Sequence, residues 1–447
     1  MGKYFGTDGF RGEANKVLNV EHAYKVGRYL GWYYGKEHKC RVVIGKDTRR
    51  SGYMFEYALV AGLTASGAEA YLLHVTTTPS VAYVVRSENF DCGIMISASH
   101  NPYYDNGIKL INSRGEKMSE AIIEEVEKYL DGEFGEIPFA TGENIGFTID
   151  YAIGRNQYIG YIISLARHSY KNMKIGLDCS NGSTWMIAKS VFDALGAKTY
   201  VINNSPNGLN INMGCGSTHI EGLCELVKRE KLDIGFAFDG DADRCLAVDE
   251  NGQVLTGDHI IYLCAKYMKP ANMLNKNTVV VTVMSNLGLF KALSELGIDY
   301  IQTDVGDKYV YEAMQNGNYS LGGEESGHII FSKYATTGDG LITAIKVMEV
   351  LMESSLPASK LCEGFTRYPQ ITVNTRVTDK DAVINNPEVL AAVKKAEQTL
   401  ENNGRILLRK SGTEPVVRVM IEAESQELCK NLSQSITDVI KQTPYAE

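Results

Sequence analysis

The sequence predicts an α/β protein with three similar mixed α/β domains, whose sheets are covered by helices, and a smaller C-terminal α+β domain. The chain of 447 residues is long enough for three or four domains of the usual ~100–200 residues. Up to about residue 366, short apolar strand patterns alternate with helix patterns, which favours mostly parallel sheets covered by helices. In the last part of the chain two strand patterns follow one another directly, which indicates an antiparallel sheet.

Changes in composition place the domain boundaries. We expect domains at 1–150, 151–252, 253–366 and 367–447. Residues 131–148 contain four glycines and few periodic apolar residues, as is typical of a linker. The Glu-Asn-Gly sequence at 250–252 predicts a hairpin turn at the end of the second domain.

The predicted elements of the first two domains follow from apolar periodicity. Asn19 is suited to cap a first helix, whose apolar face carries Ala23, Val26 and Leu30. The other elements of the first domain are strands at 41–45, 70–75, 94–96 and 108–110 and helices at 51–67 and 119–130, with a further helix after the second of these strands. In the second domain we expect strands at 174–178, 199–202, 234–238 and 245–248, and a helix that ends near 196.

The same patterns continue to the C-terminus. The third domain is predicted to contain strands at 278–283 and 300–303, helices at 286–296 and 340–352, and a helix that opens at 305–309. The C-terminal domain is predicted to contain strands at 370–377, 405–409 and 416–423 and helices at 387–400 and 426–441.

The composition is that of an ordinary globular protein, with 44% apolar and 22% charged residues. A net charge of −9 argues against nucleic acid or an anionic membrane as the main partner. The nine cysteines are scattered and form no Cys-x-x-Cys pair, which favours reduced thiols and shows no zinc site. Without an apolar signal core or a run of ~18 apolar residues, the expected location is the cytoplasm.

The first chemical motif follows the apolar strand pattern at 94–96. It reads Ser-Ala-Ser-His-Asn at 97–101, and Pro102 prevents a helix from continuing it. Asn106 and Gly107 predict a turn before the returning strand at 108–110. A serine at a rigid strand end, beside a histidine and Lys109, suits covalent chemistry, and a hairpin with a polar tip explains the same residues equally well.

Two further turns carry cationic residues. Three glycines within residues 6–12 give a backbone that turns tightly and presents its amides to an anion, and Arg11 can add a bidentate phosphate contact. The Lys-Asp-Thr-Arg-Arg-Ser-Gly turn at 46–52 joins a strand pattern to a helix pattern, and a solvated charge cluster is an equal interpretation.

Asp239, Asp241 and Asp243 alternate with Gly and Ala between two apolar strand patterns. This spacing directs three hard oxygen ligands toward one point, as Mg²⁺ requires, whereas an acidic surface turn is the alternative. The Gly-Gly-Glu-Glu-Ser-Gly-His segment at 322–328 offers acceptors to sugar hydroxyls, but it is also typical of a turn between strands. Two arginines, two hydroxyls and a glycine at 409–418 indicate a phosphate site.

Taken together, these motifs resemble those of the α-D-phosphohexomutase superfamily, in that superfamily's order and over the whole chain. They resemble its phosphoserine loop, magnesium loop, sugar-recognition loop and phosphate-binding loop, and the Gly-Lys-Asp-Thr-Arg pattern at 45–49 also recurs there. The opening loop and the segments at 180–183, 207–212 and 215–219 are most similar to bacterial phosphoglucosamine mutases. The resemblance implies that the four domains surround a central cleft.

The resemblance also implies residue roles. Ser99 would carry the transferred phosphate, and Mg²⁺ would bind that phosphoserine together with Asp239, Asp241 and Asp243. Arg11 and Lys109 would stabilise the transferring phosphoryl group, and His100, Lys109 or His328 would handle protons, in an order that the sequence leaves open. The implied substrate-binding residues are Arg244, Glu324, Ser326, Arg409, Ser411, Gly412, Thr413 and Arg418.

Three positions depart from the family's pattern. Phe10 stands where isoleucine is usual, and Ala242 stands where glycine is usual, which is tolerated if φ of Ala242 is negative. Glu325 stands where phosphoglucosamine mutases often have glutamine, so that the preferred sugar stays open.

The implied reaction interconverts glucosamine 6-phosphate and glucosamine 1-phosphate through a phosphoserine enzyme and a 1,6-bisphosphate, for the synthesis of UDP-N-acetylglucosamine and cell-wall precursors. The implied cofactors are Mg²⁺ and, as activator, glucosamine 1,6-bisphosphate or glucose 1,6-bisphosphate. The partners are small sugar phosphates, and a homodimer is compatible with the resemblance. A phosphomannomutase or phosphoglucomutase, a phosphatase with a phosphoserine intermediate, and a non-catalytic phosphosugar-binding protein stay open.

Overall fold

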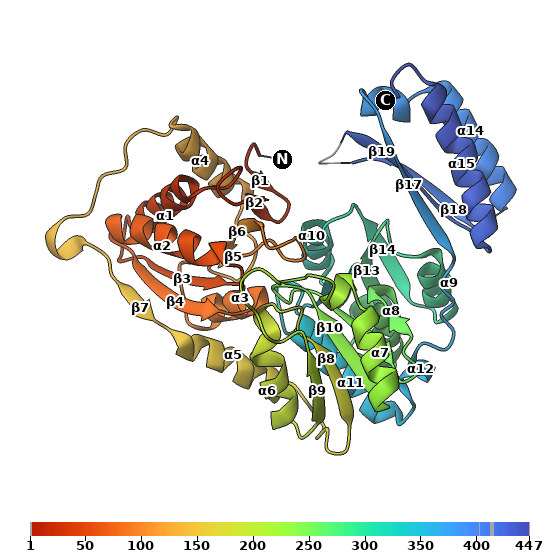
Figure 1. The fold of residues 1–447 in the computed structure, drawn as a ribbon, viewed down its shortest axis with the longest axis horizontal. Helices are drawn as coiled ribbons and strands as arrows, with labels where there is room; N and C mark the ends of the chain where they lie inside the picture. Colours follow the sequence, from red (N-terminus) through yellow and green to blue (C-terminus); the bar gives the residue numbers. More distant parts are fainter. Residues whose placement is uncertain (1, 402, 412–414, 447) are drawn as a thin grey trace. The chain divides into compact units, whose positions relative to one another are not determined.

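The computed structural model describes residues 2–401, 403–411 and 415–446. The chain forms two compact units. The first contains the chain up to Met284 together with Gly297–Glu363, and the second contains Ser285–Leu296 and the chain from Gly364 onward. The first unit holds three sheets and the second unit holds one, so the predicted α/β class with a smaller C-terminal α+β domain is confirmed (Figure 1).

The first sheet has seven strands in the order β1-β2-β6-β5-β3-β4-β7. Its pairings are parallel from β5 through β3 and β4 to β7, and antiparallel between β5, β6, β2 and β1. The sheet is therefore mixed rather than mostly parallel, because β6 returns directly beside β5. The strands are β1 Phe5–Gly6, β2 Gly9–Glu13, β3 Arg41–Lys46, β4 Glu69–Val75, β5 Cys92–Ile96, β6 Asp105–Asn112 and β7 Thr148–Asp150.

Helices cover both faces of this sheet (Figure 1). Alternate residues of the central strands belong to different hydrophobic clusters, since Val42 and Ile44 pack with residues of α1, α2 and α4 while Val43 packs with residues of α3. The helices are α1 Val20–Tyr34, α2 Ser51–Ala65, α3 Thr78–Ser87 and α4 Glu120–Asp131. The predicted linker contains the short helix η1 Gly142–Asn144 and leads into β7.

The predicted turn at Asn106 and Gly107 is wrong, because both residues lie inside β6. Gly107 pairs with Arg11 of β2, and the chain turns earlier, between the ends of β5 and β6. A side chain at Gly107 would lie 2.5 Å from the carbonyl oxygen of Ser97. The glycine is therefore needed for a close approach of two backbones and not for a positive φ.

Two further sheets complete the first unit, and both combine parallel and antiparallel strands. Their strand orders are β12-β11-β10-β8-β9 and β14-β13-β15-β16. The strands of the first of them are β8 Lys174–Asp178, β9 Lys198–Ile202, β10 Ile234–Phe238, β11 Cys245–Asp249 and β12 Val254–Leu255. The strands of the other are β13 Thr278–Thr282, β14 Asp299–Thr303, β15 Leu321–Gly323 and β16 Ile329–Phe331.

The helices that accompany these two sheets follow the predicted alternation. They are α5 Ala152–Ser164, α6 Ile187–Ala194, α7 Glu221–Glu230, α8 Gly257–Met268, α10 Asp307–Gly317, α11 Gly340–Ser354 and α12 Ala358–Leu361, with the short turns η2 Ser183–Trp185, η3 Gly216–Thr218 and η4 Asn275–Asn277. None of the helices formed by the described residues has the length and apolar character that crossing a bilayer requires.

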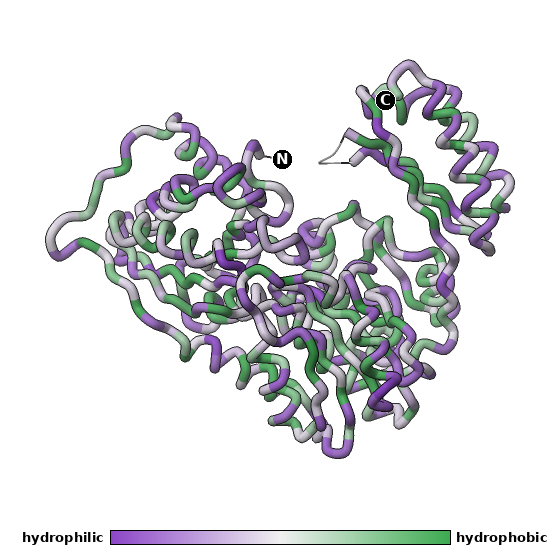
Figure 2. Tube along the Cα trace, in the orientation of Figure 1, coloured by the Kyte–Doolittle hydropathy of each residue, from purple (hydrophilic) through white to green (hydrophobic). Residues whose placement is uncertain are grey.

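The second unit is built on the antiparallel sheet β17-β19-β18. Its elements are β17 Gln370–Arg376, β18 Arg405–Lys410, β19 Val416–Glu422, α13 Lys380–Ile384, α14 Pro387–Leu400 and α15 Gln426–Gln442. Hydrophobic and hydrophilic residues alternate along α15 (Figure 2), whose apolar side buries Cys429, Ile436 and Ile440.

The helix α9 Leu287–Glu295 also belongs to the second unit, although the sequence places it between two strands of the third sheet. Glu422 of β19 explains this packing. Its buried carboxylate accepts hydrogen bonds from Asn286 Nδ2 at 3.1 Å and from the Leu287 amide at 2.9 Å, and it pairs with Arg405 at 2.6 Å.

We predict that Gly107→Ala destabilises the protein, because the new methyl group would overlap the Ser97 carbonyl. Overpacking of this kind costs about 1–3 kcal/mol, so the thermal midpoint of the first unit should fall. Gly160→Ala is the matched control, since Gly160 lies in α5 with no atom within 4 Å of the added Cβ, and it should melt no earlier than wild type. Equal melting of both variants would contradict the close approach of Gly107 to the Ser97 carbonyl.

Candidate active site

The serine loop, which we define as residues 97–101, connects β5 to the turn before β6. Ser99 is fully buried and has a left-handed backbone, with φ of 50°. Its amide donates to Ser97 Oγ at 2.9 Å, and its hydroxyl donates to Asp239 Oδ2 at 2.5 Å. The predicted nucleophile therefore meets the predicted metal loop although 140 residues separate them in the chain.

The aspartate loop, which we define as residues 239–244, connects β10 to β11 and places Asp239, Asp241 and Asp243 around one point. One oxygen from each carboxylate lies within 4.8 Å of the others, and all three residues are buried. Asp241 Oδ1 and Asp243 Oδ1 accept no hydrogen bond from any residue that the structure describes. Burial, Asp243 and Asp241 raise the pKa of Asp239 well above its usual range. A hard divalent cation would relieve this repulsion, so the donor set fits one.

Ala242 does not meet the condition stated for its tolerance, because its φ is +60° rather than negative. The alanine therefore occupies the left-handed conformation that its usual glycine would adopt freely, at a cost of about 1 kcal/mol. The amide of Gly340, at the start of α11, donates to the Ala242 carbonyl at 2.9 Å and helps to hold this conformation.

Lys109 lies on β6 and is the main counter-charge of the aspartate loop. Its Nζ lies 2.8 Å from Asp241 Oδ2, 3.1 Å from Asp243 Oδ2 and 3.1 Å from Asp8 Oδ2. Burial alone would lower the pKa of Lys109, but these three carboxylates raise it well above its usual range. Lys109 is therefore a fixed positive charge at neutral pH and is poorly suited to accept a proton.

The glycine-rich segment 6–12 forms the hairpin of β1 and β2. Arg11 lies on β2 and pairs with Asp8, whose other oxygen lies 3.2 Å from Lys117 Nζ. Burial would lower the pKa of Arg11, but Asp8, Asp241 and Asp243 raise it. The predicted arginine thus lies in the field of the aspartate loop.

His100 lies between the serine and Arg244. Its Nδ1 is 3.1 Å from a guanidinium nitrogen of Arg244 and 3.4 Å from Ser99 Oγ. Burial, Arg244 and Arg11 lower the pKa of His100 to about 4. At neutral pH the ring is therefore uncharged, and its Nδ1 is an acceptor.

The segment 322–328 ends β15 and forms the hairpin loop before β16. His328 is buried, with Nε2 3.3 Å from the Gly338 amide and 3.5 Å from Asp307 Oδ2, while its Nδ1 has no hydrogen-bond partner among the described residues. Glu324 is half-buried and Ser326 is exposed. Burial, only partly offset by nearby His328, raises the pKa of Glu324. A backbone bridge between Arg244 and His328 joins this hairpin to the aspartate loop.

Sequence reasoning missed three charged residues that link these loops. Lys117, which follows β6, donates to the Thr7 carbonyl at 2.7 Å and pairs with Asp307 of α10 at 2.7 Å as well as with Asp8. Asp8 lies inside the glycine-rich segment, and Asp307 lies at the start of a predicted helix. Their positions in these predicted elements were the signal that could have identified them. No pattern singled out Lys117.

The predicted phosphate site of the second unit is partly described. Arg409 of β18 lies directly opposite Arg418 of β19, and burial together with Arg418 lowers the pKa of Arg409. Like charges directly opposite one another on a sheet are destabilising, so that binding of an anion here would be favourable. Ser411 is buried, with its carbonyl 2.8 Å from Lys380 Nζ. Gly412 and Thr413 lie outside the described residues.

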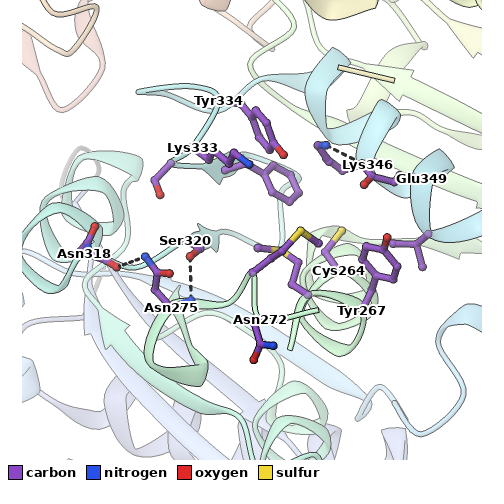
Figure 3. A pocket seen from close by; sticks show the side chains of 15 residues that line it. Cys264, Tyr267, Asn272, Asn275, Asn318, Ser320, Lys333, Tyr334, Lys346 and Glu349 are labelled. Carbon is purple, nitrogen blue, oxygen red and sulfur yellow. Dashed lines mark hydrogen bonds and ion pairs between the residues drawn. The ribbon is translucent and has the colours of Figure 1, made fainter. Parts of the chain in front are cut away.

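A cavity of about 430 Å³ lies between α8, β16 and α11, and none of the predicted site residues lines it (Figure 3). Two of its three charged lining residues form an ion pair, because Lys346 lies 2.6 Å from Glu349, and Lys346 also lies over the Tyr334 ring. The cluster around Ser99, rather than this cavity, is therefore the candidate active site.

Comparison with protein families finds the four domains of a single family. Four family models match in sequence order, described as phosphoglucomutase/phosphomannomutase alpha/beta/alpha domain I over residues 2–135, domain II over 156–252, domain III over 256–368, and C-terminal domain over 373–439.

Similar proteins carry related names. The phosphoglucosamine mutase of Lachnospira eligens is 66% identical over 100% of both chains. Among solved structures, a phosphoglucomutase/phosphomannomutase family protein of Burkholderia thailandensis matches with a TM-score of 0.80 at 23% identity, over 98% of this chain and 97% of that one. N-acetylphosphoglucosamine mutase of Aspergillus fumigatus, in complex with GlcNAc-6P and magnesium, matches with a TM-score of 0.64 at 21% identity, over 91% and 83%.

We predict that His100 titrates near pH 4 in the metal-free protein, measured by NMR of ring-labelled histidine with His100→Gln to identify the signal. Because an unfolded histidine titrates near pH ~6.5, the unfolded chain binds the proton first as the pH falls. His100 therefore lowers stability progressively between these two values and adds no further change below the lower one. Arg244→Gln should raise the midpoint of the His100 titration, because it removes a positive charge beside the ring. A midpoint above pH ~6 in the folded wild type would contradict this environment.

Proposed function

We propose that this chain, which belongs to the phosphoglucomutase/phosphomannomutase family, interconverts glucosamine 6-phosphate and glucosamine 1-phosphate. The observation that carries the proposal is the contact of the buried Ser99 hydroxyl with Asp239, at the edge of three clustered carboxylates. A hydroxyl in this position is presented for phosphoryl transfer, and the 66% identical relative bears the name phosphoglucosamine mutase.

In this mechanism Ser99 carries the phosphate that moves to and from the sugar. A phosphoserine brings a charge of about −2, which Lys109 and Arg11 would balance. Asp239, Asp241 and Asp243 would hold Mg²⁺ together with the phosphoserine, and the bound ion would supply further charge neutralisation for the transfer.

The proton-handling groups follow from the electrostatics of the site. Lys109 is held in its charged form, so it is better placed to stabilise the phosphoryl group than to exchange protons. His100 is neutral and its Nδ1 lies 3.4 Å from Ser99 Oγ, so its position allows it to accept the serine proton when the serine is rephosphorylated, whereas its low pKa makes it a weak base. His328, with a ring nitrogen that bonds no described residue, is the candidate for the sugar hydroxyl.

The intermediate would be a 1,6-bisphosphate that reorients so that its second phosphate meets Ser99. Arg409, Ser411, Gly412, Thr413 and Arg418 would hold whichever phosphate is not reacting. Arg244, Glu324 and Ser326 would bind the sugar. We also propose that glucosamine 1,6-bisphosphate or glucose 1,6-bisphosphate acts as activator, and that the enzyme works in the cytoplasm, where its nine free cysteines stay reduced.

The relatives' name favours glucosamine over the alternative substrates mannose and glucose phosphate. The test is kcat/KM for glucosamine 1-phosphate against mannose 1-phosphate and glucose 1-phosphate. A higher kcat/KM for mannose 1-phosphate or for glucose 1-phosphate would assign a phosphomannomutase or a phosphoglucomutase activity to the chain. The proposed mechanism would stay the same.

We predict that incubation with glucose 1,6-bisphosphate adds one phosphate to the wild-type protein, seen by intact mass spectrometry and located on Ser99 by peptide mapping. Ser99→Ala should acquire none and should lose at least ~10³-fold in kcat, because the covalent intermediate can no longer form. Turnover of that variant near the wild-type rate would exclude a phosphoserine mechanism. Steady release of inorganic phosphate at the rate of sugar turnover would instead indicate a phosphatase.

Arg418→Ala should raise KM for the sugar phosphate about 30-fold or more, because a bidentate charged contact contributes roughly 2–4 kcal/mol. Stability should change by no more than about 1 kcal/mol. Lys410→Ala is the matched control, since this exposed neighbour pairs with Asp381 on the surface, and its KM should stay unchanged. Early melting of Arg418→Ala with an unchanged KM would make the arginine pair structural.

A further inference from the structure

The carbonyl oxygen of Ser99 receives hydrogen bonds from two residues that the mechanism above does not use. Arg49 donates to it at 3.0 Å, and the Asn212 side-chain amide donates to it at 2.8 Å. The same two groups also donate to the carbonyl of Asn101, at 2.6 Å and 3.0 Å respectively. Two side chains thus hold the same two carbonyls on either side of His100.

Arg49 comes from the turn between β3 and α2, which the sequence leaves open as a solvated charge cluster. The structure excludes that interpretation, because Arg49 and Asp47 are both fully buried and form an ion pair. Asp47 also accepts from Ser97 Oγ at 2.6 Å, and Ser97 Oγ accepts from the Ser99 amide. The Asp47–Arg49 pair therefore holds the amide of Ser99 through Ser97 as well as its carbonyl.

Asn212 comes from the polar loop at 207–212 after β9, to which no role was assigned. Its own amide donates to the Ser180 carbonyl at 2.9 Å, so the side chain projects from an anchored backbone. Gly240, inside the aspartate loop, completes the surroundings of the Ser99 carbonyl. A Cβ on Gly240 would lie 2.5 Å from that oxygen and 3.0 Å from Asn212 Nδ2.

A serine with a left-handed backbone needs such support. Non-glycine residues rarely adopt φ near +50°, and surrounding contacts must hold them there. If the Ser99 backbone relaxed to a negative φ, its hydroxyl would no longer meet Asp239. Arg49 and Asn212 are buried and make their bonds to the backbone on the carbonyl side, away from the hydroxyl that reacts.

We propose that Arg49 and Asn212 are positioning residues for phosphoryl transfer, which hold the serine loop in its left-handed conformation so that Ser99 Oγ stays at the aspartate loop in every half-reaction. The inference rests on the proposed function, because it requires Ser99 to be the phosphate carrier. It assigns a role to two segments, 46–52 and 207–212, that the four motifs leave unexplained.

The experiment uses Arg49→Lys and Asn212→Ala in the full chain. Lysine keeps the positive charge of Arg49 but lacks the planar fork that reaches two carbonyls and Asp47 together. Arg50→Lys is the control for the arginine, since Arg50 is the exposed neighbour. Asn210→Ala is the control for the asparagine, since Asn210 bonds the Ser205 carbonyl within the same loop and does not contact the serine loop in any hydrogen bond given by the structure.

Each protein is mixed rapidly with glucose 1,6-bisphosphate, and the phosphate on Ser99 is followed by mass spectrometry. Two quantities are read, namely the rate of phosphorylation and the fraction of chains finally phosphorylated. We expect both test variants to react about 10- to 100-fold more slowly, as for a small misplacement of a reacting group. The final fraction should equal that of wild type, kcat should fall in parallel, and KM should change less than about threefold. Both controls should react at the wild-type rate.

Two results would overturn the inference. Phosphorylation of both test variants at the wild-type rate would show that the carbonyl contacts are dispensable. A reduced final fraction at an unchanged rate would show that the residues act only on folding, since the correctly folded molecules would then react normally. Failure of the wild-type protein itself to acquire phosphate is a separate result, which would remove the proposed function and this inference with it.

Discussion

The arrangement of the first unit depends on the pairing of Lys109 with the aspartate loop. Three buried carboxylates at one point are strongly unfavourable unless cations compensate them. Lys109 contacts Asp241 and Asp243 directly, and Arg11 and Lys117 reach the same cluster through Asp8. Lys109 and Arg11 lie on strands of the first sheet, whereas Asp239, Asp241 and Asp243 lie in the loop between two strands of the second. Charge balance therefore requires the two sheets to meet at this point.

The same requirement explains why the site has little freedom to rearrange. The Ser99 hydroxyl meets Asp239, its carbonyl meets Asn212, and Gly240 leaves just enough room for that carbonyl. The third sheet joins the cluster through Asp307 and His328. The protein's own contacts thereby hold these groups in place, which favours catalysis by pre-organised charges and dipoles.

The charged residues of the second unit are arranged differently from those of the first. Its sheet is antiparallel, and a single buried carboxylate, Glu422, binds the start of α9 and the side chain of Arg405. The opposed arginines Arg409 and Arg418 lie on the same sheet and repel one another. The unit thus has a buried carboxylate with cationic and amide partners where it packs against α9, and two opposed arginines where we propose that a phosphate binds.

The sequence by itself determined the order and type of the elements and the chemical motifs, because both depend on residues that are close in the chain. Apolar periodicity predicted the strands that carry the serine and aspartate loops, and the Asp-x-Asp-x-Asp spacing predicted the carboxylate cluster. Local patterns misled at Asn106 and Gly107, where the glycine permits a close approach between strands. They left φ of Ala242 open, and the tertiary structure holds it at a positive value.

Only the tertiary structure decided which distant residues support the site. Lys117 belongs to no pattern, and the patterns that contain Arg49 and Asn212 do not show what these residues bind. Their contacts join distant parts of the chain, and 190 residues separate Lys117 from Asp307. A local pattern carries no information about such contacts, because burial and charge pairing are set by how the sheets meet. The sequence therefore determined what chemistry is present, and the packing of the sheets decided where each group is held and whether it is charged.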